Sequence, residues 1–366
     1  LGRRTFLPEH LQSKWSLPYS HLSVAGTFSN SMSPHWSFGF HRKISFHLMF
    51  QRQRVKPSQR RKGGVTRIAV YAIGGNALSS PHSNEEDASA EVLARVMSDV
   101  IDLLEAGWGV VLTHGNGPQV GHLMELDPGQ TQSMDSWVAA TQGMIGHSLA
   151  LNLDSILHRR KRPERTACVI TRVLVNGDDS GFGHPTKPVG PILSPEVVMS
   201  ADWDIAETIQ GPRRVVASPL PMKVIDLPVI RKLVELHAVV ICGGGGGIPI
   251  IERGDHFVGV PAVIDKDRLS ALLAIQLEAD ALIISTAVDA VRSDFGGENE
   301  KTHHRLSLDE CDQFMEQGEF PPGSMAPKIG SLMEAAFHRP GLSAILCQPG
   351  DALLALRGEA GTTIFV

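Results

Sequence analysis

The chain has 366 residues, of which 42% are apolar and 20% charged, with a formal net charge of −5 and four cysteines. This length allows one large domain or two medium ones, each with its own hydrophobic core. No apolar run approaches the roughly 18 to 20 residues of a membrane helix, so we expect a soluble protein without a membrane partner. The cysteines lack CxxC pairing, which suggests neither a disulfide framework nor a zinc site and favours a reducing compartment.

Charge is distributed unevenly along the chain. Residues 1–67 hold 12 Lys or Arg and a single acid, Glu9, whereas the remaining residues hold 22 bases and 38 acids. We therefore predict a basic extension without a stable fold at 1–66 and a separate domain at 67–366. Three origins of the extension stay open: an organelle transit segment, a nucleic-acid-binding arm, or upstream sequence translated from a misplaced start.

From Arg67 onward, short apolar runs alternate with segments of helical periodicity. RIAVYAI at 67–73 predicts a buried strand, and apolar residues at every third or fourth position from Val92 to Leu104 predict a helix that Gly107 ends. The other predicted strands are 108–113, 166–173, 238–242, 281–286 and 343–347, and the other predicted helices are 135–157, 267–278, 307–317 and 325–337. This alternation predicts a mostly parallel sheet covered on both faces, with ligands at the strand ends.

Residues 177–191 interrupt the alternation, because seven of the fifteen are Gly or Pro. Such a segment cannot be a regular core element, so we expect an excursion from the sheet. Loops of this kind often carry function, although an ordinary surface loop is the alternative.

Three predicted strands end in glycine-rich loops: Gly74-Gly75-Asn76, Gly115-Asn116-Gly117 and Gly243 to Gly247. Glycine lets backbone N–H groups approach phosphate oxygens closely. A single Gly pair is more often a tight turn, but three such loops at equivalent strand ends predict one shared crevice. The usual phosphate motifs are absent, because there is no GK dipeptide for a P-loop and no third glycine for GxGxxG. The DFG triplet at 294–296 also lacks the other protein-kinase motifs.

Two lysines lie where helices are predicted to begin. Lys266 opens one helix, and Lys328 lies in the first turn of another, for which Ser324 is the expected cap. A cation at a helix N-terminus costs up to roughly 1 kcal/mol unless an anion binds there. This placement favours phosphoryl transfer, although ordinary surface lysines are the alternative. Asp267 is either a helix-start acid or a carboxylate that orients the lysines and meets a nucleotide metal.

The order of the motifs resembles carbamate kinases, which are members of the amino-acid kinase superfamily. AIGGNAL, THGNGPQVG, TQGMIG, HPTKPVGP, RRVVASP, GGGGGIPI, VIDKD and PGSMAPK follow one another between Arg67 and the C-terminus. The resemblance implies a three-layer α/β/α sandwich around an eight-stranded, mostly parallel sheet, with a small protruding subdomain at about 177–213. It also implies a cytoplasmic homodimer that works in arginine metabolism.

The resemblance further implies reversible phosphoryl transfer between ATP and carbamate, giving ADP and carbamoyl phosphate, with Mg²⁺ accompanying the nucleotide. Carried over by motif, Lys187, Lys266 and Lys328 would stabilise the transferred charge and Asp267 would organise them, without a general base or a protein-bound metal. The residues implied to line the carbamate and phosphate groups are Gly74, Gly75, Asn76, Gly115, Asn116, Gly117, Gly243, Gly244, Gly245 and Gly246. Those implied to contact the nucleotide are Thr286, Val288, Gly323, Ser324 and Met325. No nucleic-acid partner is expected.

Four positions depart from the family pattern. Arg292 stands where a Tyr near the adenine is usual, Gly297 where a Lys is common, and Pro212 and His147 where aromatic residues are frequent. None of them is an implied catalytic residue. Two alternative functions stay open: a non-catalytic protein that binds nucleotide or carbamoyl phosphate, and a kinase that acts on a related small acid.

Overall fold

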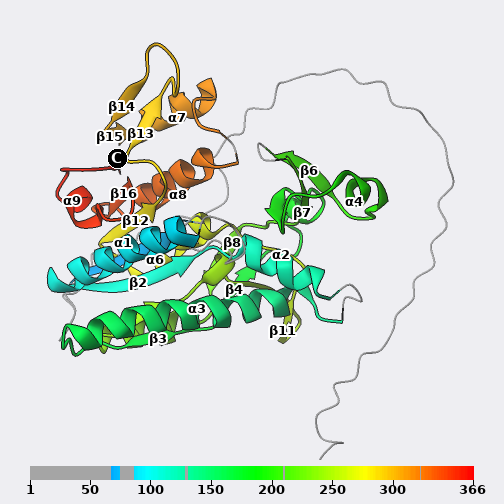
Figure 1. Cartoon of the computed structure of the whole chain (residues 1–366), viewed down its shortest axis with the longest axis horizontal. Coiled ribbons are helices and arrows are strands. Elements are labelled where there is room, and N and C mark those ends of the chain that lie inside the picture. The colour runs from blue at the N-terminus through cyan, green and yellow to red at the C-terminus, as the bar shows by residue number, and fades with distance from the viewer. Residues whose placement is uncertain (1–66, 75–85, 128–130, 209–210, 322) are drawn as a thin grey trace, which may run out of the picture. The chain divides into compact units, whose positions relative to one another are not determined.

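The computed structural model describes residues 67–74, 86–127, 131–208, 211–321 and 323–366 (Figure 1). The chain divides into two units, Leu1–Pro57 and Ser58–Val366, and every described residue belongs to the second. The predicted extension at 1–66 and the predicted site residues Gly75 and Asn76 lie outside the described residues. No helix among the described residues is long and apolar enough to cross a membrane.

The centre of this unit is an eight-stranded sheet in which only β16 and β17 run antiparallel to each other. Every residue of β2 and β12, the two strands that flank β1, is buried, as expected for strands that are covered on both faces. The strands in spatial order are β15 (Arg305–Ser307), β17 (Thr362–Phe365), β16 (Ser343–Cys347), β12 (Ala281–Ser285), β1 (Arg67–Ile73), β2 (Trp108–His114), β9 (Val239–Ile241) and β3 (Thr166–Cys168).

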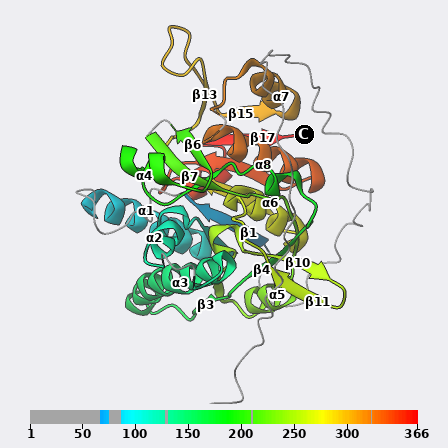
Figure 2. The same ribbon diagram turned by 90° about the vertical axis from the view of Figure 1, so that its right-hand side faces the viewer.

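Side chains of the central strands alternate between two hydrophobic cores. Tyr71 and its alternate neighbours on β1 pack against α1 (Glu86–Glu105), α3 (Met134–Arg159) and α9 (Ala352–Leu356). Val70 and its alternate neighbours face the opposite core. That core includes α5 (Leu227–Glu235), α6 (Lys266–Leu277) and α8 (Met325–His338). The helices therefore lie on both faces of the sheet (Figures 1 and 2), and the predicted α/β/α sandwich is confirmed.

Smaller elements surround the sandwich. A second sheet has the order β11, β10, β4, β8, and β13 pairs with β14 in a hairpin. A third sheet has the order β5, β7, β6 and lies, with α4, to the right in Figure 1. The bounds are α2 (Gly117–Glu125), β4 (Arg172–Val175), β5 (Lys187–Val189), α4 (Pro195–Ser200), β6 (Ile205–Thr208), β7 (Gly211–Val216), β8 (Pro221–Val224), β10 (Ile248–Arg253), β11 (His256–Gly259), β13 (Val291–Ser293), β14 (Lys301–His303) and α7 (Leu308–Gln317).

The predicted strand at 166–173 is wrong in its extent. The chain leaves the central sheet after Cys168 and enters the second sheet at Arg172. Thr171 lies between the two strands, and its backbone N–H donates to the side chain of Gln142 at 2.8 Å. A side chain of α3 thus replaces a strand partner at this point, which the apolar pattern cannot reveal.

The 177–191 segment is only partly irregular. It contains the 3₁₀ turn Ser180–Phe182 and the strand β5, and the side chain of Val189 is 1% exposed in a small core. This strand forms because its three residues pair with β7, and not because of a long apolar run. The subdomain predicted at about 177–213 stays a prediction, and the β5–β7–β6 sheet with α4 covers most of that range.

Candidate active site

The carboxyl ends of four parallel strands bring glycine and polar residues to one edge of the sheet. β1 ends before Gly74, and its last residue pairs with His114 at the end of β2. β9 and β12 flank this pair, so Cys242-Gly243 and Ser285-Thr286 end at the same edge. A Cβ on Gly74 would lie 2.7 Å from the carbonyl oxygen of Ser285, so only glycine fits there. The described parts of the three glycine-rich loops therefore meet at this edge, and the crevice that they were predicted to share stays a prediction.

Helix α6 begins at this edge with two predicted site residues in its first turn. Asp265 is the N-cap, and its carboxylate accepts hydrogen bonds from the backbone N–H groups of Asp267 and Arg268. Lys266 is the first helical residue, as predicted, and the aliphatic part of its side chain lies against Gly115. The cap fixes the direction of this turn and therefore of both side chains.

Asp267 is a buried carboxylate between two lysines. Its side chain is 4% exposed, Lys266 Nζ lies 2.5 Å from Oδ1, and Lys328 Nζ lies 3.2 Å from Oδ2. Burial lowers the pKa of Lys266, and the Asp267 charge opposes that change. Both carboxylate oxygens pair with the lysines, so Asp267 holds the two ammonium groups together, and its role in catalysis stays a prediction.

Lys187 reaches the same helix start from β5. Its Nζ lies 2.5 Å from Oδ2 of Asp265, which is 15% exposed. Burial alone would raise the pKa of Asp265, but the nearby Lys187 and Lys266 charges lower it well below its usual range. Three lysines thus share two carboxylates, and the remaining positive charge favours an anionic ligand. No role of Asp265 follows from the sequence pattern, and only its place in the VIDKD stretch could have drawn attention to it.

The five-glycine loop is packed too closely for any side chain. A Cβ on Gly245 would lie 2.2 Å from the side-chain amide of Asn116, and one on Gly246 would lie 2.1 Å from the carbonyl oxygen of Ile264. Gly243 donates its N–H to the Thr171 hydroxyl, while Gly246 and Gly247 donate theirs within the loop. The loop therefore supports Asn116 and the residue before Asp265. Three of its N–H groups already have partners, and a phosphate role for Gly243 to Gly246 stays a prediction.

Asn116 and His114 are both buried beside this loop. Asn116 donates from its side chain to the Thr141 hydroxyl at 2.8 Å, and Gly117 begins α2. Burial lowers the pKa of His114 to about 4, and the Lys266 charge acts in the same direction. The imidazole is therefore neutral at pH 7 and adds no repulsion to the lysines. His114 belongs to the THGNGPQVG motif, but the sequence pattern predicts no role for it.

The residues predicted to contact a nucleotide lie on two neighbouring segments. Thr286 follows β12 and donates its N–H to Cys347 at 2.9 Å, and Val288 packs against the hydrophobic core. Gly323, Ser324 and Met325 precede Lys328 at the start of α8. Ser324 is the N-cap residue of α8, as predicted, but its side chain accepts no cap hydrogen bond. The backbone N–H groups of Ser324 and Met325 both donate to Pro321 instead.

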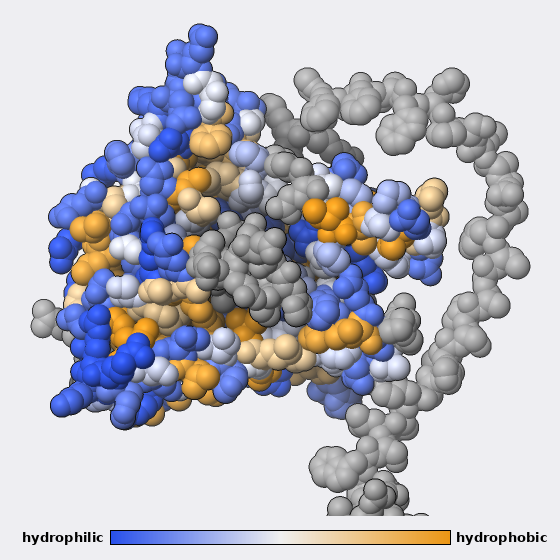
Figure 3. Space-filling view, viewed as in Figure 1, coloured by the Kyte–Doolittle hydropathy of each residue, from blue (hydrophilic) through white to orange (hydrophobic). Residues whose placement is uncertain are grey.

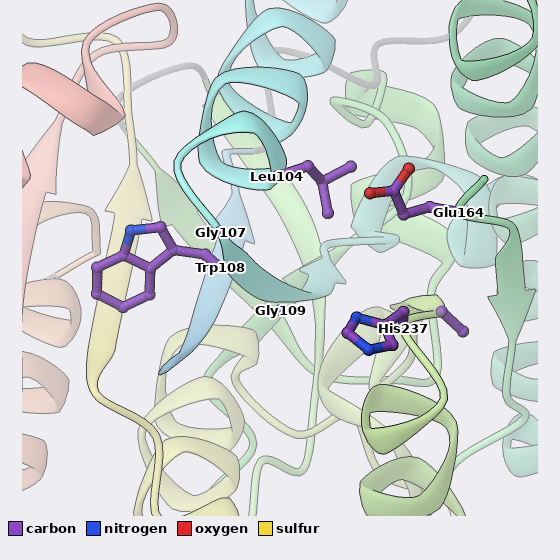
Figure 4. A pocket seen from close by; sticks show the side chains of 7 residues that line it. Leu104, Gly107, Trp108, Gly109, Glu164 and His237 are labelled. Carbon is purple, nitrogen blue, oxygen red and sulfur yellow. The ribbon is translucent and has the colours of Figure 1, made fainter. Parts of the chain in front are cut away.

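A separate cavity of about 270 Å³ lies at the opposite, amino-terminal ends of β2 and β9. In Figure 4 the side chains of Glu164 and His237 project toward this cavity, whereas the Trp108 indole points away from them. Arg162 pairs with Glu164. No predicted site residue lines this cavity, so it is distinct from the predicted site at the carboxyl ends of the strands.

Comparison with known proteins assigns the family. The sequence profile of the amino acid kinase family matches residues 67–343, and the chain belongs to that family. The chain is similar to carbamate kinase from Clostridium perfringens, with 37% identity over 309 residues that cover 81% of this chain and 98% of the relative. It is also similar to carbamate kinase-like protein YqeA from Escherichia coli, with 38% identity over 82% of this chain and 99% of the relative. A structure of carbamate kinase from Giardia lamblia bound to AMP-PNP has a TM-score of 0.73 and 31% identity, over 82% and 98% of the two chains.

Proposed function

We propose that this chain catalyses reversible phosphoryl transfer between ATP and carbamate, with ADP and carbamoyl phosphate as the other pair. The observation that carries this proposal is Asp267, a buried carboxylate that holds Lys266 and Lys328 together at the start of α6. A migrating phosphoryl group gathers negative charge on its equatorial oxygens, and two oriented ammonium groups at a helix N-terminus match that charge. The relatives named carbamate kinase support the choice of acid.

In the ATP-forming direction, a β-phosphate oxygen of ADP bonds to phosphorus as the bond between phosphorus and the carbamate oxygen breaks. We assign Lys187 to the carbamate and transferred phosphate, Lys266 to the phosphoryl group in flight and Lys328 to the β/γ-phosphates. Both reacting oxygens are already anionic, so no general base is required. We also assign the lining of the carbamate and phosphate groups to Gly74, Gly115, Asn116 and Gly117, as the resemblance implies.

Mg²⁺ fits this site as a companion of the nucleotide. The described residues contain no group of three or more His, Cys, Asp or Glu that could hold a metal ion. Mg²⁺ at kinase sites takes most of its ligands from substrate phosphates and water, so a protein cage is not required. When bound, the ion neutralises phosphate charge and orients the β and γ groups. Asp267 is buried, and its two oxygens already pair with Lys266 and Lys328.

We also propose a homodimer. Met144 and Leu151, which are 58% and 60% exposed, lie seven residues apart on one face of α3, and Ile170 follows the edge strand β3. Apolar residues occur among the charged ones where α3 lies (Figure 3). An exposed apolar face beside a free sheet edge is suited to pairing with a second copy. The cytoplasmic location and the place in arginine metabolism stay predictions.

A second candidate function is nucleotide or carbamoyl phosphate binding without turnover. Arg292 stands at the position where a Tyr is expected, and its guanidinium is held by Asp289 at 3.0 Å and Glu300 at 2.6 Å. A charged, paired side chain there presents a different surface to an adenine ring from that of a tyrosine. The similarity to a relative named only carbamate kinase-like also favours this candidate.

ATP formation from carbamoyl phosphate and ADP in the presence of Mg²⁺ distinguishes the two functions. We expect ATP to form with the parent chain, as measured by a coupled assay, and we expect acetyl phosphate to be a much poorer donor. Nucleotide binding without ATP formation would support the second candidate. A preference for acetyl phosphate would support a kinase of another small acid.

A further inference from the structure

Asp265 connects the β5–β7–β6 sheet to the start of α6 through one carboxylate. Oδ1 accepts hydrogen bonds from the backbone N–H groups of Asp267, at 2.9 Å, and Arg268, at 3.3 Å. Oδ2 pairs with Nζ of Lys187, 78 residues earlier in the chain. The carboxylate does not belong to the group of Lys266, Asp267 and Lys328, but it touches the backbone of that group on one side and Lys187 on the other.

Gly190, the residue after β5, is held through contacts with its own backbone. Gly190 donates its N–H to the carbonyl oxygen of Gly117 at 3.2 Å, and it packs so closely on Gly121 that a Cβ on Gly121 would lie 2.0 Å from it. Arg213 of β7 donates to the Gly190 carbonyl at 2.5 Å. These contacts fix the strand near α2 but do not fix the direction of the Lys187 side chain, which is 31% exposed.

The charges explain why Lys187 needs a carboxylate of its own. Asp267 is already shared by Lys266 and Lys328, so a third ammonium group would meet net positive charge there. Without a second carboxylate, Lys187 would be repelled from the site and would turn toward solvent. The Asp265 charge offsets that repulsion. Its hydrogen bonds to the first turn of α6 also keep Lys266 and Asp267 in a fixed position relative to Lys187.

We propose that Asp265 is a positioning residue that holds Lys187 among the other lysines before a ligand binds, while its cap orders the first turn of α6. The inference rests on the proposed function for its effect on turnover, but not for its effect on the structure. Asp265 takes no part in the chemical step itself. When an anionic substrate binds, its negative charge draws the Lys187 ammonium group partly away from Asp265.

Matched substitutions separate the two contacts of Asp265. D265N keeps an oxygen that caps α6 and removes the charge that holds Lys187, whereas D265A removes both. Asp226 supplies the control, because it pairs with Arg172 at 2.7 Å and is 13% exposed, close to the 15% of Asp265, but lies outside the site. We expect D265N to lower kcat by roughly 10- to 100-fold with the KM for ADP little changed, as for a misplaced catalytic group. D226N should leave kcat within about threefold of the parent value, as expected for a pair remote from the chemistry.

The substitution K187M tests whether Asp265 acts through Lys187. If it does, adding D265N to K187M should lower kcat by no more than about threefold beyond K187M alone, because the shared contact is already lost. Additive losses in the double variant, or a D265N kcat within threefold of the parent value, would overturn the proposal. D265A should also lower the melting temperature more than D265N does. An equal decrease in the two variants would contradict a stabilising role of Asp265 as the cap of α6.

Amide hydrogen exchange gives a measurement that does not depend on turnover. We expect D265N, but not D226N, to increase exchange in residues 187–190, because β5 loses its side-chain tie to α6. Unchanged exchange in D265N overturns the proposal whatever happens to kcat. If the parent chain forms no ATP, the proposed function fails, and hydrogen exchange still decides the role of Asp265.

Discussion

At the scale of single residues, Asp267 has the largest expected effect. D267N keeps the size of the side chain but leaves the ammonium groups of Lys266 and Lys328 without a counter-charge. We expect kcat to fall by roughly 10²- to 10³-fold, as for the loss of one preorganised electrostatic group. Burial already lowers the pKa of Lys266, and losing the Asp267 charge lowers that pKa further. Because turnover needs the protonated lysine, the alkaline decline of kcat should begin at a lower pH than in the parent chain.

The measurement is kcat from about pH 6 to pH 10, with D226N as the control. A D267N profile with the same alkaline limb as the parent profile would show that the Asp267 charge does not support Lys266. A kcat within threefold of the parent value would remove Asp267 from the proposed mechanism.

The residue scale also shows what local sequence can and cannot predict. Lys266, Asp267 and Lys328 could be found because each lies at a predicted helix start. The partner of Lys187 could not, because its contact with Asp265 joins segments 78 residues apart. The structure gives the Lys187 side chain an ion pair with Asp265. Its removal should therefore cost more than a surface substitution does.

At the scale of elements, Asp99 links α1, β1 and the turn before α9. It is buried, it accepts a hydrogen bond from the Tyr71 hydroxyl at 2.7 Å, and it accepts two more from the backbone of Gly350 and Ala352. Burial raises the pKa of Asp99 from 3.8 to about 6, although these hydrogen bonds oppose the shift. The folded state therefore binds this proton more tightly than the unfolded chain does. The stability that this gives is full below about pH 4 and is lost as the pH rises through about 6.

The D99N variant tests this contribution. From pH 4 to pH 7 the free energy of unfolding of the parent chain should fall relative to that of D99N, by up to about 3 kcal/mol for a shift of about two pKa units. Chemical denaturation at several pH values measures the difference. The lowered pKa of His114 makes the free energy of unfolding change with pH in the opposite direction. This contribution is the same in the parent chain and in D99N, so it cancels in the difference between them. A difference that does not vary with pH would show that Asp99 has an ordinary pKa.

Element prediction succeeded where periodicity is strong. The buried run at 67–73 and the helices at 266–277 and 325–338 match their predictions closely. The three-residue strands β13, β14 and β15 are too short to show alternation, and each forms only by pairing with another strand: β13 with β14 in a hairpin, and β15 with the distant β17. The shift from β3 to β4 was missed for the same reason, because Gln142 on α3 decides where the strand ends.

At the scale of the whole molecule, activity should reside in the unit Ser58–Val366. The family match begins at residue 67, and the relative from Clostridium perfringens is covered over 98% of its length by 81% of this chain. Strand β1 also begins at Arg67 and lies inside the sheet, with β12 on one side and β2 on the other. Arg67 itself is anchored, because its guanidinium stacks 4.4 Å from the centre of the Trp108 ring and donates to the carbonyl oxygen of Ala106.

A chain that begins at Val65 should therefore keep the melting temperature and kcat of the full chain. A chain that begins at Gly74 supplies the control: it lacks β1, so β2 and β12 lose their shared neighbour and both cores lose their central strand, and it should not fold. Thermal unfolding and ATP formation measure both variants. A large loss of either quantity in the chain that begins at Val65 would show that residues 1–64 contribute to the folded domain or to its site, and the boundary at 66 would then be wrong.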